Sequence, residues 1–580
     1  MPSLTIDGRE LSVPHGTTVI QAAEKLGIYV PRYCYHPGLS VAGNCRICLV
    51  EVEKFPKLQI ACNAPVTEGM VVHTQSDKAK DGRRAVLEFL LANHPLDCPV
   101  CDQSGECDLQ NFYMNFGLYN PRFREHKVKK KKAVALGPHV MLDQERCILC
   151  SRCVRFTDEI TETGEFGIFN RGDRAELALY PGQVLNNAYS ANVVDICPVG
   201  ALTERDFRFK ARVWYLSSAA TVCNGCSQGC NIDMHFLLDR PHLNDGARLV
   251  RVKPRYNPHV NQWWMCDEGR YGFRWVDKQR LTQVRGPSGE TTWEQALTTI
   301  AARMAELGRA VGGSSVVPPS RLHGAGGTPA PQSSIGPDAQ QGGARIGVIA
   351  SSQLTNEELF LIREIFQGAL GARVTGSVPQ QPGSCDDFLI KADKNPNTLG
   401  ATLLGLAGTG TPEAAQILDG ALDGNLEALW VFGQDLVKLC GEGKTRQLSQ
   451  KLSLLVYSGT NENPTVPLAH WVLPTAAYVE KDGTFVNCHG RIQRIGRVLP
   501  PLGDSREDWR ILLELAGKMG LPLAWRAPEE VFQALASAVA PFEGLSYESI
   551  GAHGVDLQSR EHEGAEAEPR PSACGGSRAT

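Results

Sequence analysis

Cysteine spacing constrains this chain more than any other feature of its sequence. The sequence has 19 cysteines in 580 residues, and 15 of them lie before residue 270. Together with one histidine, these 15 form four groups of four side chains. Closely spaced cysteines in a reducing compartment are interpreted as metal ligands before disulfides. We therefore predict four metal centres. The remaining cysteines are scattered and are expected to be ordinary thiols: Cys385, Cys440, Cys488 and Cys574.

The sequence shows neither an export signal nor a membrane span, which supports the reducing compartment. The start, MPSLTIDGRELSV, lacks the charged head and apolar core of a signal peptide. No apolar run reaches the roughly 18 residues that a membrane span needs. The formal net charge of −4 gives no overall footprint for nucleic acid. The basic run at 126–132 is expected to be a solvated connector, with a docking strip for an acidic partner as the alternative.

The first group follows a predicted β-hairpin (4–6 and 11–13, turning at Asp7-Gly8) and a short helix beginning after Thr18. Its members are Cys34, Cys45, Cys48 and Cys62. A pair two residues apart lets one tight loop give two thiolates to iron, and Gly38 and Gly43 let backbone amides face the cluster. Structural zinc is the alternative, although its usual second Cys-x2-Cys pair is missing. The wide first gap resembles a [2Fe-2S] ferredoxin domain.

The second group mixes imidazole and thiol: His94, Cys98, Cys101 and Cys107. Without His94 it would have only three ligands, which is why we include the histidine. A neutral imidazole in place of a thiolate removes one negative charge from the site, a change that raises the reduction potential in Rieske centres.

The third group carries the Cys-x2-Cys-x2-Cys run typical of a [4Fe-4S] ferredoxin. Its members are Cys147, Cys150, Cys153 and Cys197. In ferredoxins with two such runs the Cys-Pro cysteine serves the other cluster, but only one run exists here. Cys197 therefore most simply completes the same site.

The fourth group has the spacing Cys-x2-Cys-x3-Cys with a distant fourth member: Cys223, Cys226, Cys230 and Cys266. This spacing resembles the [4Fe-4S] motif at the front of molybdopterin enzymes such as formate dehydrogenases. After about residue 280 the pattern changes to helices at 293–308 and 356–370 and buried strands at 345–349, 428–432 and 453–457. Such alternation indicates an α/β unit with a parallel sheet.

The order of the groups, and segments such as NHPLDCPVCDQSGECDLQ, RCILCSRCVRF, DICPVGALT, NPNTLGA and EKDGTFVNCHGRIQ, resemble the large iron–sulfur subunit of bacterial respiratory complex I. The resemblance implies one [2Fe-2S] and three [4Fe-4S] clusters. It implies electron transfer from a flavin- and NADH-binding subunit toward quinone, with proton translocation by the whole complex. It also implies other peripheral-arm partners and a peripheral position on the cytoplasmic side of the bacterial inner membrane. No catalytic residue is expected on this chain.

The expected fold is multidomain, α/β and α+β. We predict a [2Fe-2S] ferredoxin-like β-grasp domain (1–78), a histidine-ligated [4Fe-4S] domain (79–120), a ferredoxin-like [4Fe-4S] domain (136–212) and a molybdopterin-oxidoreductase-type [4Fe-4S] domain (216–272). A shortened molybdopterin-oxidoreductase-like domain (273–550, with a linker at 312–344) and a disordered tail (551–580) follow.

The alternative function is a catalytic or relay subunit of an NAD-linked formate dehydrogenase or hydrogenase. A molybdopterin enzyme needs a metal-ligating cysteine after the fourth group, and only Cys385 is available. Such enzymes usually carry lysine where this chain has Glu268. We therefore expect no molybdopterin. A zinc-stabilised scaffold without redox chemistry is the remaining alternative.

Overall fold

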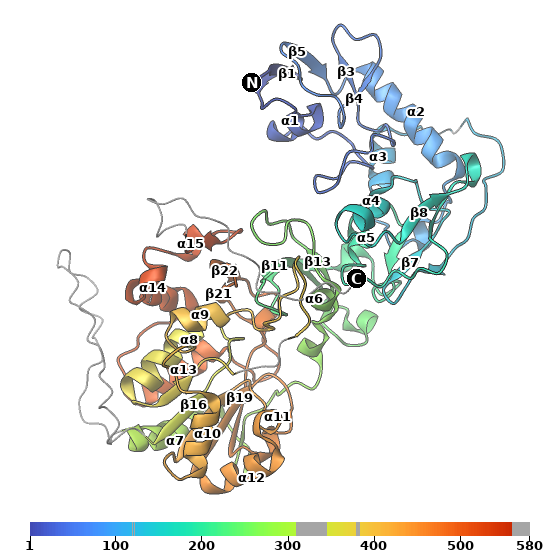
Figure 1. Cartoon of the computed structure of the whole chain (residues 1–580). Coiled ribbons are helices and arrows are strands. Elements are labelled where there is room, and N and C mark those ends of the chain that lie inside the picture. The colour runs from blue at the N-terminus through green and yellow to red at the C-terminus, as the bar shows by residue number, and fades with distance from the viewer. Residues whose placement is uncertain (119, 121, 309–344, 379–382, 559–580) are drawn as a thin grey trace, which may run out of the picture. The chain divides into compact units, whose positions relative to one another are not determined.

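The computed structural model describes residues 1–118, 120, 122–308, 345–378 and 383–558 (Figure 1). The predicted linker at 312–344 lies outside the described residues. The chain divides into two compact units, which are described separately. The first contains residues 1–217, 236–251 and 263–267, and the second contains 218–235, 252–262 and the chain from Glu268 onward.

The first unit begins with the predicted hairpin and helix. β1 (Ser3–Ile6) and β2 (Arg9–Ser12) pair antiparallel around Asp7 and Gly8, which both have positive φ. The sheet order is β2-β1-β5-β3-β4, with β3 (Leu49–Val52), β4 (Gln59–Ile60) and β5 (Met70–His73). α1 (Val19–Lys25) starts where the Thr18 backbone N–H bonds Gln21 Oε1 at 2.9 Å. Alternate strand residues and one face of α1 form the apolar core of this domain.

Short elements joined by loops make up the rest of the first unit. α2 (Asp77–Asn93) starts earlier than the predicted 84–92 and stops, as predicted, before His94-Pro95. The next elements are η1 (Cys98–Val100), α3 (Asp108–Phe116), β6 (Val134–Ala135), β7 (Val140–Leu142), α4 (Arg152–Glu159), β8 (Phe166–Phe169), η2 (Gly172–Arg174), β9 (Glu176–Leu179), α5 (Asn192–Asp195), β10 (Leu202–Glu204), η3 (Val213–Tyr215) and η4 (Pro241–Asn244). β10, β7 and β6 form one small sheet, and β8 and β9 form a hairpin.

The second unit contains the predicted parallel sheet. The sheet order is β15-β14-β20-β19-β18-β16-β17, with β16 to β20 running parallel. The strands are β14 (Arg285–Gly286), β15 (Gly289–Glu290), β16 (Ile346–Ile349), β17 (Arg373–Thr375), β18 (Ala428–Phe432), β19 (Leu454–Gly459) and β20 (Trp471–Pro474). A second sheet has the order β21-β22-β23, and a third has the order β11-β12-β13. Their strands are β21 (Gly483–Val486), β22 (Arg491–Ile495), β23 (Val555–Asp556), β11 (Ser217–Val222), β12 (Asn231–Phe236) and β13 (Leu249–Pro254).

Helices cover both faces of the parallel sheet (Figure 1). The helices from α6 onward are α6 (Asp267–Tyr271), η5 (Arg274–Asp277), α7 (Trp293–Gly308), α8 (Asn356–Ile362), η7 (Arg363–Ala369), α9 (Thr398–Leu403), α10 (Ala414–Leu422), α11 (Leu436–Cys440), α12 (Glu442–Lys451), η8 (Val466–Leu468), η9 (Tyr478–Glu480), α13 (Asp508–Lys518), α14 (Pro528–Ala538), η10 (Ala540–Phe542) and α15 (Tyr547–Ile550). Not all of these pack on the sheet itself, but α7, α8 and α13 contribute to the core on one side, and α10 and α12 to the core on the other.

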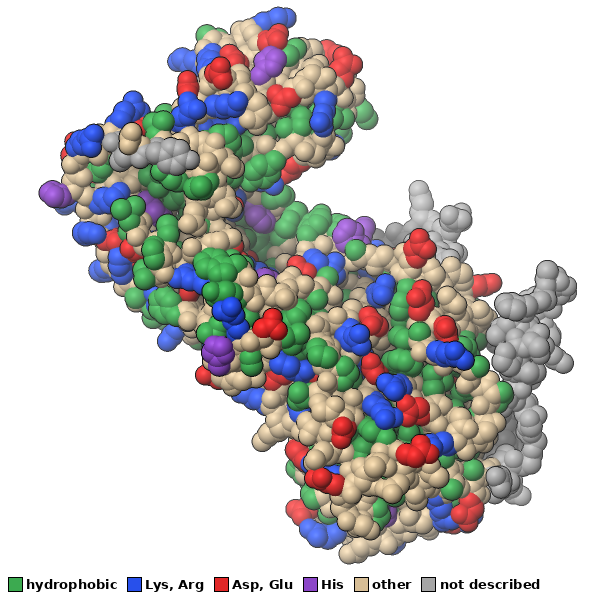
Figure 2. Space-filling view, turned by 180° about the vertical axis from the view of Figure 1, so that it is seen from behind, with side chains coloured by type: hydrophobic (Ala, Val, Ile, Leu, Met, Phe, Trp, Pro, Cys, Tyr) green, Lys and Arg blue, Asp and Glu red, His purple; other side chains and the backbone are tan. Residues whose placement is uncertain are grey.

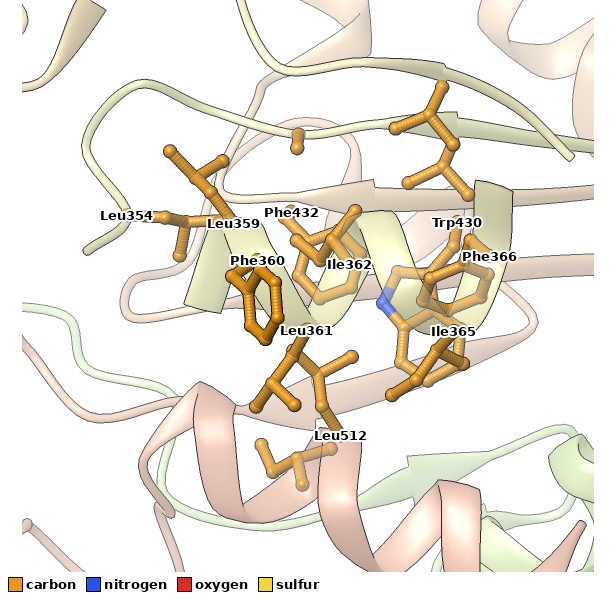
Figure 3. Packing of buried hydrophobic residues seen from close by; sticks show 14 of the residues in the cluster. Leu354, Leu359, Phe360, Leu361, Ile362, Ile365, Phe366, Trp430, Phe432 and Leu512 are labelled. Carbon is orange, nitrogen blue, oxygen red and sulfur yellow. The ribbon is translucent and has the colours of Figure 1, made fainter. Parts of the chain in front are cut away.

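Alternation along β18 explains how both faces become buried. Trp430 and Phe432 point into the core shared with α8 and α13, where both rings pack against Phe366, and Leu512 of α13 belongs to the same core (Figure 3). Val431, between them, belongs to the core on the opposite face. Successive strand side chains point to opposite faces, so a fully apolar strand is the pattern of a sheet covered on both sides.

Two segments differ from the sequence prediction. The helix from Asn356 changes at Arg363 to a π-helix that ends at Ala369. The prediction of disorder from 551 is wrong for 551–558, because β23 pairs with β22, with Val555 opposite Ile492. The remainder of that tail is not among the described residues.

The surface carries charges of both signs. On the face drawn in Figure 2, Lys and Arg side chains are interspersed with Asp and Glu, in keeping with the small net charge. Within the described residues, no helix is both long and apolar enough to cross a membrane.

Candidate metal centres

The four cysteines of the first group meet at the end of the N-terminal sheet. Cys34, Cys48 and Cys62 are buried, and the Cys45 and Cys62 thiols lie close enough to Cys34 to lower its pKa, as Cys62 lowers that of Cys48. The Cys34 backbone N–H points at Cys45 Sγ, 3.4 Å away. Amide donors aimed at sulfur stabilise an anionic cluster, so this nest fits a four-thiolate iron–sulfur site.

The second group lines one small cavity. His94, Cys98, Cys101 and Cys107 all contribute to its wall, together with Gly200. A Cβ on Gly200 would collide with Cys101 Sγ, so only glycine leaves room there. Burial, with the nearby Lys127 and Arg146 charges, lowers the pKa of His94 to about 4. The imidazole is therefore neutral near pH 7, the form that binds metal.

The third group lines a second small cavity, enclosed by apolar side chains. Its wall contains Cys147, Cys150, Cys153 and Cys197. Burial raises the pKa of the Cys147 thiol to about 12 and that of Cys150 to about 11. Thiols in such an apolar place ionise only when a metal compensates the charge. The Leu149 N–H donates to Cys147 Sγ at 3.4 Å.

The second and third groups each line a small cavity. Side chains that line a cavity leave room for a polynuclear group such as an iron–sulfur cluster, whereas a single structural zinc draws four ligands to within about 2.3 Å of one point.

The third group lies between the other two. On one side, the Asn44 side-chain amide donates to Leu149 O at 3.2 Å, joining the first and third loops. On the other side, Asp108 N donates to Pro198 O at 3.0 Å, joining the second and third loops. Members of all three groups share one apolar core. The third group is therefore in contact with both of the others, while the first and second groups also approach each other where the Tyr33 ring packs against Phe112 at 5.1 Å.

The fourth group is divided between the two units. Cys223, Cys226 and Cys230 are buried in the second unit, where Cys223 N donates to Cys230 O at 2.8 Å. Cys266 is buried in the first unit. Its neighbour Asp267 accepts hydrogen bonds from Ser190 Oγ at 2.6 Å and Ala191 N at 3.1 Å. The assignment of these four cysteines to one site stays a prediction.

Two buried arginines near the first and third groups are features that the sequence analysis missed. Arg83 and Arg152 are 0% and 8% exposed, and neither forms an ion pair within the described part of the chain. The Nε atoms of both lack a hydrogen-bond partner there. Uncompensated cations beside thiol nests fit a bound anionic group, and an iron–sulfur cluster with four thiolates is one. Arginines placed between ligand cysteines, as in RCILCSRCVRF, were the available signal.

The basic run is largely exposed, as a solvated connector would be, but two of its lysines are bonded to their own fold. Lys127 Nζ donates to Leu91 O at 2.7 Å and to Ala92 O at 2.9 Å, capping the last turn of α2. Lys132 is 2.9 Å from Glu145 and 3.2 Å from Asp143. The run is therefore bonded to its own fold beside His94, which sequence composition could not reveal.

A cavity of about 370 Å³ opens in the second unit at the carboxyl ends of β18, β19 and β20. Ligands of open α/β sheets bind at such ends. Both lysines that line it are already paired with carboxylates: Lys481 with Glu358 at 2.7 Å and Asp508 at 3.2 Å, and Lys394 with Glu268 at 2.8 Å. Neither lysine is therefore a free cation for the phosphate of a pterin.

Family models match the chain in the predicted order. They are the 2Fe-2S iron-sulfur cluster binding domain (2–77), the NADH-ubiquinone oxidoreductase-G iron-sulfur binding region (83–122) and the NADH-quinone oxidoreductase subunit 3 ferredoxin-like domain (137–203). The Molybdopterin oxidoreductase Fe4S4 domain (216–278) and Molybdopterin oxidoreductase (396–518) follow. Fold and sites thus define a multidomain iron–sulfur oxidoreductase subunit, which confirms the expected fold class.

Relatives that match most of the chain are more specific. The mitochondrial NADH-ubiquinone oxidoreductase 78 kDa subunit of Candida albicans is 33% identical, over 90% of this chain and 83% of the relative. The G subunit of NADH-quinone oxidoreductase from Rickettsia felis is 31% identical, over 94% and 92%. The chain belongs to this family of large iron–sulfur subunits of NADH-quinone oxidoreductase, and the resemblance seen in the sequence is confirmed. Among solved structures, an NAD+-reducing [NiFe]-hydrogenase chain is 30% identical over 37% of this chain and 91% of its own, with a TM-score of 0.33.

Proposed function

We propose that this chain conducts electrons through NADH:quinone oxidoreductase, along iron–sulfur clusters held by the four predicted ligand groups. The chain's family and its iron–sulfur domains support the function. The single observation that supports the route is the chain of contacts through the third group, with the first group on one side and the second on the other. The proposed inventory is one [2Fe-2S] and three [4Fe-4S] clusters, within the domain boundaries predicted above.

The residues of this chain hold, insulate and tune the clusters, which supply the one-electron chemistry when bound. Apolar side chains around the third group exclude water, and amide N–H groups directed at sulfur favour the reduced, more negative state. The imidazole of His94 makes its site less negative than a four-thiolate site. No proton acceptor or nucleophile is required on this chain.

The second group supports an exit to a partner. Cys98 is exposed, and so are the apolar side chains two residues to either side of it in the sequence, Leu96 (89%) and Val100 (59%). The helices before and after this segment each add one exposed apolar side chain, Phe89 (83%) in α2 and Met114 (64%) in α3. Large apolar side chains left exposed are typical of interaction surfaces when they form one patch. We propose that a neighbouring peripheral-arm subunit covers them and accepts the electron.

The first group is then the input side. We propose that the donor is the flavin- and NADH-binding subunit, and that the assembled complex lies on the cytoplasmic side of the bacterial inner membrane.

The test is Cys147→Ala in the purified complex, with Cys440→Ala as the control, since Cys440 is a lone thiol of the second unit whose Sγ contacts Leu436 O. We expect Cys147→Ala to lose about four irons and one NADH-reducible EPR signal, and to block electron transfer to quinone. Cys440→Ala should match the unsubstituted complex. An unchanged spectrum and rate in Cys147→Ala would remove the third group from the route.

A further inference from the structure

Helix α4 carries two arginines that donate hydrogen bonds to the loop of the first ligand group. α4 begins between two ligands of the third group, because Arg152 and Arg155 lie on either side of Cys153. The loop that they hold, residues 34–40, starts at the first ligand of the first group. The first turns of the helix therefore carry a ligand of the third site and the arginines that contact the loop of the first.

Arg155 joins the two sites through a single nitrogen. Its Nη2 donates to the backbone carbonyl of Cys34 at 2.6 Å and to that of Cys150 at 3.3 Å. Both acceptors belong to proposed ligand residues, one from each site. Within each cysteine, only Cα and Cβ separate the carbonyl carbon from the sulfur. Arg155 therefore completes a short path of covalent and hydrogen bonds between the two thiols.

Neighbouring contacts fix the geometry of this bridge. Arg155 Nη1 donates to Ser40 O, and Nε donates to Ser151 Oγ at 3.3 Å. One turn later on α4, Glu159 Oε2 accepts from Ser40 N at 2.8 Å. The same loop is thus held at both ends from one face of the helix.

Arg152 holds the adjacent peptide but bridges no pair of ligands. Its Nη2 donates to Tyr35 O at 2.6 Å and its Nη1 to Ile196 O at 3.0 Å. The two arginines therefore have different roles. Arg152 is buried and joins residues next to the ligands, whereas Arg155 joins two ligand residues themselves.

We infer that Arg155 is a positioning residue for electron transfer between the first and third sites, because its guanidinium locks the Cys34 loop onto the Cys150 loop. The inference rests on the proposed function. A guanidinium suits the task because its planar fork donates to several carbonyls at fixed angles, whereas a lysine ammonium offers one mobile point of charge. Transfer between two centres slows steeply as their separation grows or the atoms between them are removed.

The experiment compares Arg155→Met and Arg155→Lys in the purified complex. Arg174→Met is the control, since Arg174 is an exposed arginine of η2 in the same unit. The readouts are iron and sulfide content, the dipolar coupling between the two reduced centres in pulsed EPR, and the rate at which the third site is reduced after the first. The dipolar coupling reports separation and is independent of turnover.

We expect Arg155→Met to keep its iron, to show weaker dipolar coupling, and to slow reduction of the third site, with the loss of rate growing with the increase in separation that the coupling reports. Arg155→Lys should fall between Arg155→Met and the unsubstituted complex, and Arg174→Met should match the latter. Unchanged coupling and rate in iron-replete Arg155→Met overturn the inference.

Two further outcomes are also decisive. If Arg155→Met loses iron, Arg155→Lys, which keeps the charge and one donor, becomes the test, and normal coupling and rate in it overturn the inference. Failure of the proposed function would appear differently: the unsubstituted complex itself would lack NADH-reducible signals from the two sites.

Discussion

The first and second units differ in the groups that surround some of their buried lysine and arginine side chains. In the second unit, Lys481 is enclosed by Glu358 and Asp508, and Arg280 is paired with Glu480 at 2.7 Å. In the first unit, Arg83 and Arg152 are equally buried, but their described partners are backbone carbonyls. Other buried arginines of the first unit do have carboxylate partners, since Arg146 pairs with Asp143 and Arg251 with Glu106. The contrast is therefore confined to the two arginines beside the ligand groups, which are left to be compensated by what those groups bind.

Their apolar cores differ in the same way. The core under β18 and α8 consists of large aliphatic and aromatic side chains packed around Trp430, Phe432 and Phe366. The core shared by the first three ligand groups includes the cysteines themselves. Hydrophobic burial can drive folding of the second unit, while metal binding supplies part of the folding free energy around the ligand groups of the first.

Removing iron should give the largest contrast between the units. Anaerobic chelation of the purified chain is expected to speed the hydrogen exchange of backbone amides at 94–107 and 147–153. The loops at these positions lose the bound clusters that hold them in place. Strands β18 and β19 should stay protected. Hydrogen exchange with mass spectrometry measures both, and equal loss in the two units would abolish the contrast between them.

Removing a buried cation from the second unit should have the next largest effect. Lys481→Met leaves Glu358 and Asp508 facing each other without compensation, a change that typically costs about 3–5 kcal/mol. Hydrogen exchange of peptides in α8 and α13 reports the destabilisation. The control is Lys444→Met, whose 4.0 Å pair with Asp419 is exposed and should contribute less than about 1 kcal/mol. Similar losses of stability in both variants would mean that the buried ion pairs of Lys481 contribute no more than the exposed pair of Lys444.

The stability of the second unit should also depend on pH, because this unit buries carboxyl groups of its own. Burial raises the pKa of Glu357 from 4.5 to about 7, despite hydrogen bonds from Thr484 and Tyr547. The folded state therefore binds the proton more tightly, so the stability contribution is complete below pH 4.5 and is lost as pH rises through 7. The total is about 3 kcal/mol at about 1.36 kcal/mol per pKa unit.

Asp508 titrates in the same direction, since burial raises its pKa to about 7 while Lys481 opposes the rise. Glu357→Gln should thus reduce the fall in stability between pH 5 and about 8 without abolishing it. Exchange rates of α8 amides, corrected for intrinsic pH dependence, measure the slope. A slope that is identical in Glu357→Gln would exclude Glu357 as its source.

The smallest effect is expected at a close approach in the first unit. A Cβ on Gly38 would lie 2.6 Å from Trp263 Cε3, so Gly38→Ala overpacks this site at a cost of about 1–3 kcal/mol. The matched control is Gly16→Ala, where nothing lies near the added carbon, although its φ of +85° adds backbone strain. Faster exchange in the 34–40 loop for Gly38→Ala alone is the expected result. Equal loop protection in both variants would contradict it.

The sequence predicted the parts that depend on local periodicity and spacing. Alternation located β1 and β2, the apolar runs located β16, β18 and β19, and His94-Pro95 marked the end of α2. Spacing also grouped the side chains that line the second and third cavities. These features arise from neighbours along the chain.

The rest depends on contacts between distant segments. Arg155 meets Cys34 across 121 residues, and Gly200 approaches Cys101 from another loop. β23 is ordered because of its pairing with β22, although the segment around it is polar and rich in glycine. The internal bonding of Lys127 and Lys132 likewise appears only when the chain is folded. Local periodicity and spacing carry no signal for such pairs.

Counting iron and acid-labile sulfide in the anaerobically purified chain tests the central claim most directly. Four occupied ligand groups, one with two irons and three with four, predict about 14 irons and about 14 sulfides per chain, with negligible zinc. A colourless preparation that contains zinc in place of iron would contradict the account.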